Sequence, residues 1–204
     1  MNKRIAGCCL FAFISMLTVQ AGAISLSFVP SSTSINILEN LDVNIVLSAM
    51  ADNDTISTFD IDIEFNPSVL SFNSISLGSG LGDVSTGDAE DLSLGNIGSG
   101  TVNIAELSWI WPDLSIGGSF FDDQFTSSSD SLILATLSFT GTAEGSSALL
   151  FSRVLLGDEY GIGFYTTLDT GFVTVNAPVP EPTTMLLFGV GIVGLVGSRF
   201  RKKK

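Results

Sequence analysis

Apolar and polar residues alternate strictly through residues 59–65, which read Phe-Asp-Ile-Asp-Ile-Glu-Phe. Successive side chains of a β-strand point to opposite faces, so this segment predicts a strand with one apolar face and one acidic face. The following pair, Asn66-Pro67, predicts a turn. We expect the acidic row on the solvated face of a sheet, and its members are Asp60, Asp62 and Glu64.

Eight further segments show strand patterns between turns rich in glycine, serine, asparagine and aspartate: 24–28, 34–38, 41–47, 69–77, 101–111, 131–139, 147–156 and 172–175. Many short strands with almost no helical period predict an all-β fold, an antiparallel sandwich of nine strands. Two connections, 78–100 and 112–130, are long for a compact domain. Connections of that length are usually functional or mobile.

Both ends of the chain depart from this pattern, and the N-terminal end predicts a secretory signal peptide. Residues 1–23 have a basic start, an apolar run and small residues at the cleavage position, Ala21 and Ala23. Cleavage after Ala23 leaves residues 24–176 as the single folded domain.

The C-terminal end predicts one transmembrane helix over residues 183–198, which contain no charge. Sixteen helical residues rise ~24 Å against ~30 Å of bilayer hydrocarbon, so the span is short. Basic residues of the tail 199–204 can snorkel to the interface. They also predict that this tail stays in the cytoplasm and that the rest of the chain is exported.

The composition of the exported segment excludes several chemistries. The chain has no histidine, and its two cysteines, Cys8 and Cys9, lie in the signal peptide. A thiol nucleophile, a disulfide and a histidine base are therefore excluded from the domain. Of the 21 acidic residues only Glu181 follows Pro180, and of the eight basic residues only Arg153 lies in the domain, so its charge is about −19. Such a surface repels nucleic acid.

Residues Pro180, Glu181 and Pro182, the short glycine-rich span after them and the basic tail closely resemble the PEP-CTERM sorting signal of Gram-negative bacteria that make exopolysaccharide. The resemblance implies that an exosortase recognises the linker 177–182 and cuts near it. It also implies export through the inner membrane and a final place in the cell envelope, on the outer surface or in the extracellular matrix.

Residues 61–72, which read Ile-Asp-Ile-Glu-Phe-Asn-Pro-Ser-Val-Leu-Ser-Phe, resemble the segment of cohesin domains in which a strand is followed by Asn/Asp-Pro, Val-Leu and a second strand. Residues 132–139 resemble a later central strand of that family. The resemblance implies a cohesin-like jelly roll of nine strands over residues 24–176, which binds a dockerin-like partner through one sheet face. No dockerin-contacting residue can be carried over by motif.

Three residues of the domain are candidates for binding. Trp109 and Trp111 alternate and are expected on the same side of a strand. We favour core packing beside Leu107, because such rings bury strongly, and stacking on sugar rings is the alternative. We expect Arg153 to pair with a carboxylate, and orienting an acidic ligand is its second hypothesis.

The first long connection is a candidate for an irregular calcium site. Four of its residues offer carboxylate oxygens, which calcium prefers: Asp83, Asp88, Glu90 and Asp91. Acidic loops are more often merely solvated, so the pattern does not require calcium. Calcium is the only cofactor that the sequence suggests.

These observations favour a non-enzymatic surface or matrix protein with a cohesin-like module that binds an envelope protein or the exopolysaccharide. The alternative is a secreted carbohydrate-active enzyme with paired carboxylates such as Glu64 and Glu106. Two carboxylates act on a glycosidic bond at ~5–9.5 Å, a distance that alternate members of the acidic row Asp60, Asp62 and Glu64, with Cβ atoms ~7 Å apart, also meet.

Overall fold

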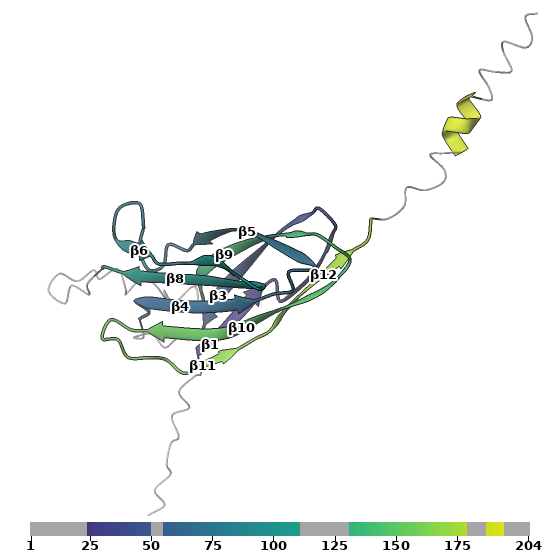
Figure 1. Ribbon diagram of the computed structural model, residues 1–204. Helices are drawn as coiled ribbons and strands as arrows, with labels where there is room; N and C mark the ends of the chain where they lie inside the picture. Colours follow the sequence, from purple (N-terminus) through teal and green to yellow (C-terminus); the bar gives the residue numbers. More distant parts are fainter. Residues whose placement is uncertain (1–23, 50–54, 111–130, 179–186, 194–204) are drawn as a thin grey trace, which may run out of the picture.

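The computed structural model describes residues 24–49, 55–110, 131–178 and 187–193 (Figure 1). The signal peptide with Ala21 and Ala23, the motif Pro180-Glu181-Pro182 and most of the expected membrane span lie outside these residues. The predictions for their structure therefore stay predictions.

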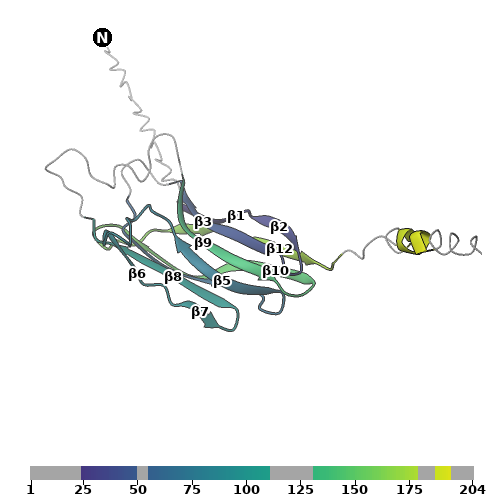
Figure 2. The same cartoon turned by 90° about the horizontal axis from the view of Figure 1, so that it is seen from above.

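The domain is a sandwich of two β-sheets (Figures 1 and 2). The first sheet has the order β11 (Thr166–Leu168), β1 (Ile24–Val29), β3 (Asn40–Ser48), β9 (Ser131–Gly141) and β5 (Leu70–Leu77). The second has the order β2 (Ser32–Asn36), β12 (Gly171–Asn176), β10 (Gly145–Gly157), β4 (Thr58–Glu64), β8 (Thr101–Ser108) and β6 (Ala89–Asp91), and β7 (Gly95–Gly98) also pairs with β8. Neighbouring strands are antiparallel except β1 with β11 and β2 with β12, which are parallel.

The predicted β-sandwich is confirmed, but the strand count differs. The described residues hold twelve strands where the sequence predicted nine. The additional strands are β6 and β7, which lie inside the predicted loop 78–100, and β11. Each has only three or four residues, and the sequence of β7 is Gly-Asn-Ile-Gly. Such short strands lack a readable alternation, and they form because a neighbouring strand offers free backbone hydrogen-bonding groups.

The core is the layer between the two sheets, where alternate residues of most strands are buried. Phe59, Ile61 and Ile63 of β4 are each at most 1% exposed, as their spacing predicted. Aromatic rings join the sheets: Phe28 of β1 stacks on Phe151 of β10 with ring centroids 4.1 Å apart. These contacts fix which face of each strand is inside.

Truncating a core residue of β4 should therefore be costly. We expect Ile61→Ala to lower the free energy of unfolding by ~2–5 kcal/mol, because it removes buried methyl groups and leaves a cavity. Chemical denaturation followed by circular dichroism measures the loss. The exposed neighbour Glu64 is the control, and Glu64→Gln should change the stability by less than ~0.5 kcal/mol. Equal losses in the two variants would contradict this assignment of faces.

Candidate functional site

The outer face of the seven-stranded sheet carries the acidic row that the sequence predicted. Asp60 and Asp62 are partly exposed and Glu64 is exposed. The same side chains stand opposite residues of β10 on one side and β8 on the other. On this face, the carboxylates of β4 therefore lie beside outward side chains of β8 and β10.

A β-bulge turns the domain's only basic residue toward this row. The pairing of β10 with β4 shifts between Phe151 and Arg153, so that Ser152 and Arg153 are both exposed. In a regular strand the inward position of Phe151 would place Arg153 inside as well, because residues two apart share a face. The extra residue moves the guanidinium outside.

Arg153 forms the expected pair with a carboxylate. Its Nη2 lies 2.8 Å from Oδ2 of Asp60, although Asp62 is its direct neighbour in the register. The side chains are 48% and 34% exposed. An exposed pair of this kind contributes at most ~1 kcal/mol to stability, so little free energy is lost when Arg153 exchanges Asp60 for another carboxylate.

Asn103 of β8 ties the acidic row together, and the sequence analysis missed it. Its Nδ2 donates to Oδ1 of Asp60 at 2.8 Å and to Oδ1 of Asp62 at 2.7 Å. Its Oδ1 accepts the backbone N–H of Leu94 at 3.0 Å, and only 3% of the residue is exposed. One amide thus holds two carboxylates in place. The available signal was an asparagine at an outward position of a strand beside that row.

Two exposed leucines of β10 complete this surface. Leu150 lies opposite Glu64 and is 41% exposed, and Leu155 lies opposite Asp60 and is 56% exposed. We call the surface formed by Asp60, Asp62, Glu64, Leu150, Arg153 and Leu155 the β4–β10 face. It combines a partly exposed ion pair with exposed apolar side chains on strands that are paired on both sides.

The favoured core packing of the tryptophans is wrong for Trp109, which is 54% exposed. Glu106 points inward beside Phe59, so Leu107 lies on the outer face of β8, and the strand predicted over 101–111 ends at Ser108, before Trp109. Trp109 instead lines a hollow of about 250 Å³ at the end of β4 and β8. Trp111 lies outside the described residues. Arg153 is level with Asn103 of β8, and Trp109 comes six residues later in the chain, or ~20 Å along the strand direction. These two candidates therefore do not form one site.

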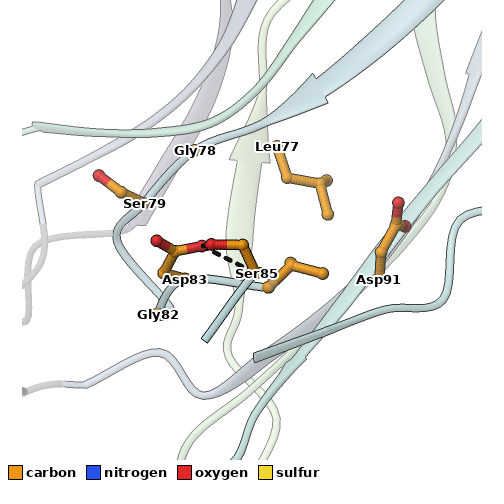
Figure 3. A pocket seen from close by; sticks show the side chains of 8 residues that line it. Leu77, Gly78, Ser79, Gly82, Asp83, Ser85 and Asp91 are labelled. Atoms are coloured by element: carbon orange, nitrogen blue, oxygen red, sulfur yellow. Dashed lines mark hydrogen bonds between the residues drawn. The ribbon is translucent and has the colours of Figure 1, made fainter. Parts of the chain in front are cut away.

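The four acids of the expected calcium site do not converge. Among the residues that the structure describes, no three acidic side chains gather closely enough to hold a metal ion. Asp83 lines a groove of about 550 Å³ with Asp91, Ser79 and Leu77 (Figure 3). Its Oδ1 accepts the hydroxyl of Ser85 at 2.6 Å and the N–H of Ser85 at 2.7 Å, which lowers the pKa of Asp83. Calcium binding stays a prediction.

Glu106 is a buried acid that faces the core. It is 1% exposed, and neither carboxylate oxygen has a hydrogen-bond partner among the described residues. Burial, together with repulsion from Asp91, its direct cross-strand neighbour, raises the pKa of Glu106 to about 7. A perturbed carboxyl is a common feature of functional sites, and it is also a cost to stability.

The proposed pairing of Glu64 with Glu106 does not match this geometry. Glu64 stands opposite Thr101 and points outward, whereas Glu106 stands opposite Phe59 and points inward. Five residues of β8 separate the two levels, or ~17 Å along the strand. Glycosidic carboxylates act at ~5–9.5 Å, so these two cannot act on one bond.

Little of the sorting region is described. Residues 187–193 are helical and exposed. Within the described part of the chain, no helix is long and apolar enough to cross a bilayer. The remainder of the expected span 183–198 lies outside that part.

Comparison with known families identifies the C-terminal region. Residues 178–202 match the PEP-CTERM protein-sorting motif, which confirms the resemblance seen in the sequence. A comparison with curated proteins gives no match.

The sandwich is similar to solved cohesin modules. A cohesin of Clostridium thermocellum, solved in a cohesin–dockerin complex, has a TM-score of 0.56 at 13% identity over 76% of this chain and 100% of that one. A cohesin module of a family 33 glycoside hydrolase from Clostridium perfringens has a TM-score of 0.55 at 13% identity, covering 78% and 98%. A non-cellulosomal cohesin of Archaeoglobus fulgidus has a TM-score of 0.52 at 12% identity, covering 80% and 96%.

Fold and motif together define the class of protein: a β-sandwich module followed by a C-terminal sorting signal. More specifically, the module has the cohesin-like fold and the signal is a PEP-CTERM motif. At these identities the structural likeness shows the fold alone.

The raised pKa of Glu106 makes stability depend on pH. A glutamate in the unfolded chain titrates near 4.5, so the folded state holds the proton more tightly up to about pH 7. The resulting stabilisation is present below pH 4.5 and is lost as pH rises to about 7, an effect of about 3 kcal/mol. Denaturant titrations between pH 4.5 and 8 measure it.

Glu106→Gln removes the titrating group and is the test variant. Its stability relative to the unmodified protein should rise across this pH range. Glu64→Gln, on the exposed face, should run parallel to the unmodified protein. A constant difference between Glu106→Gln and the unmodified protein would show that Glu106 does not titrate in this window.

Proposed function

We propose that this chain is an exported, non-enzymatic surface protein whose cohesin-like domain binds another envelope protein through the β4–β10 face. The observation that carries the proposal is the composition of that face, where an exposed Arg153–Asp60 pair lies beside Leu155. Arginine and apolar side chains in one rigid patch are typical of protein-binding surfaces. The described outer face of the other sheet is lined largely by serine, threonine and asparagine; it exposes Ile133 but carries no arginine.

The solved complexes support a protein partner. Cohesin modules of the same fold are described in complexes with dockerins. A dockerin-like partner is accordingly our first hypothesis for this chain. The exopolysaccharide is the second, and its supporting observation is the exposed ring of Trp109.

The sorting motif supports the route to the surface. A PEP-CTERM motif after the last strand implies export, transient anchoring and processing by an exosortase. β12 ends at Asn176, close to the start of the motif at residue 178, so a cut near Pro182 would release the domain with only a few extra residues. The mature product would then lie in the cell envelope, on the outer surface or in the matrix.

Processing can be tested on the mature protein. We expect mass spectrometry of protein recovered from the host's surface to show a new C-terminus close to Pro182. Replacing Pro180 and Glu181 by alanine should leave the chain uncut and in the membrane fraction. Peptides that run through residues 185–199 in most of the mature surface protein would refute exosortase processing.

Binding can be tested separately with charge-introducing variants. We expect Leu155→Glu to reduce at least tenfold the retention of the partner from host envelope extract, because a new carboxylate would lie beside Asp60. The control is Ser76→Glu, an exposed position on the other sheet, which adds the same charge. Circular dichroism confirms the fold of both variants. Equal retention by Leu155→Glu and Ser76→Glu would exclude the β4–β10 face as the binding surface.

A further inference from the structure

Trp109 lines a hollow at one end of the seven-stranded sheet, away from the centre of the β4–β10 face. The walls come from the ends of β4 and β8 and from the turn after β10. They combine one exposed aromatic ring with two serines, two acids and a glycine of that turn: Trp109, Ser57, Ser108, Asp158, Glu159 and Gly161. The volume is about 250 Å³, which suits one small ring and excludes a large cofactor.

Hydrogen bonds hold this hollow in a fixed shape. Oδ1 of Asp158 accepts the backbone N–H groups of Tyr160 at 2.9 Å and Ile162 at 2.7 Å, which closes the turn. The hydroxyl of Ser57 donates to the carbonyl oxygen of Asp158 at 2.6 Å, and Thr55 donates to Glu159. The part of the wall that comes from the turn after β10 is therefore formed without a ligand, which reduces the entropic cost of binding.

The exposure of Trp109 is the feature that needs an explanation. Tryptophan is highly buried on average, yet this ring is 54% exposed at the rim of a hollow, and Tyr160 of the same turn is 74% exposed. A flat apolar ring beside hydroxyl and carboxylate oxygens matches a ligand with an apolar ring face and a rim of hydroxyl groups. A sugar ring has this chemistry: its C–H face stacks on an aromatic ring, and its hydroxyls donate to carboxylates.

The charge of the hollow selects among saccharides. Of the described residues that line it none is basic, and two are acidic. The guanidinium of Arg153, the domain's only basic residue, is bound to Asp60, which is level with Ala105 and therefore four residues, or ~13 Å, along the strand from the level of Trp109. Uronic acids and sulfated or phosphorylated sugars would be repelled here. The hollow therefore fits a neutral sugar.

We propose that the Trp109 hollow is a binding subsite for a neutral sugar unit of a polysaccharide. This inference deepens the second hypothesis above, binding of the exopolysaccharide, by naming its site and sugar class, and it does not depend on the β4–β10 face. Trp109 supplies the stacking platform, and Asp158 and Glu159 accept hydrogen bonds from ring hydroxyls. A single shallow subsite binds weakly, so the effect becomes strong only when many sugar units are presented together.

Affinity electrophoresis tests the proposal with the full chain, purified in a detergent that has no sugar headgroup. The gels contain hydroxyethyl cellulose, dextran or galactomannan as neutral probes and polygalacturonate as the acidic probe. We expect at least one neutral polysaccharide to retard the protein and polygalacturonate to have no effect. No retardation by any neutral probe, or equal retardation by polygalacturonate, would overturn the proposal.

Variants then assign the effect to the hollow. Trp109→Ala should weaken retardation at least tenfold, Trp109→Phe should retain part of it, and Phe172→Ala, which removes an exposed ring on β12, should match the unmodified protein. Glu159→Gln should weaken it several-fold, because a carboxylate accepts hydrogen bonds more strongly than an amide. Unchanged retardation of a folded Trp109→Ala variant would refute the site.

Two further arms separate this site from other binding. An excess of arginine amide should leave the retardation unchanged, since displacement by it would identify the hollow as a site for cations, which also bind over aromatic faces. Leu155→Glu should keep full retardation by polysaccharide, and Trp109→Ala should keep the protein partner. The sugar site and the protein-binding face can thus fail independently.

Discussion

The structure depends on the burial of one face of each sheet against the other. Phe28 and Phe151 stack across the sandwich, and Phe139 of β9 contacts Phe65 edge to face at 5.3 Å. Because side chains alternate along a strand, fixing these rings inside fixes the opposite residues outside. A slip of one residue in β4 would bury Asp60 and Asp62, which makes the register strongly specified. The acidic row is therefore a consequence of the core.

The proposed binding surface arises where this alternation is interrupted. In β10 one additional residue re-aims Arg153 toward β4, and the strand then returns to its pattern with Leu156 buried. Asn103 binds two carboxylates that would otherwise repel each other on adjacent levels. The core thus sets the position of β4, while the bulge and one amide set the chemistry of the face above it. This separation lets a common sandwich present its own surface chemistry.

The sequence predicted those parts of the fold that follow from period-two alternation. The strand through Phe59 and Phe65, the sandwich class and the acidic face were all predictable, because each depends on local pattern and burial. The bulge was not, since Ser152 and Arg153 look like ordinary successive strand residues. β6 and β7 were read as loop because their pairing depends on the edge of β8, a non-local cause. The exposure of Trp109 was missed because alternation alone does not say which face of β8 is inside, and here the inner face holds Glu106 while Leu107 lies on the outer one.

The end of β8 departs most clearly from the ordinary relation of hydropathy to burial. Within four residues a carboxyl, Glu106, is buried without a hydrogen-bond partner among the described residues, and an indole, Trp109, is exposed. Each arrangement costs stability, and a sequence shaped by stability alone would exchange them. Departures of this kind are expected at functional sites, where residues serve binding as well as stability. The backbone N–H of Trp109 donates to the carbonyl of Asp88 at 2.8 Å, so the backbone that carries the ring is anchored to the segment just before β6. An exposed ring on an anchored backbone, beside a formed hollow, is what a stacking site requires.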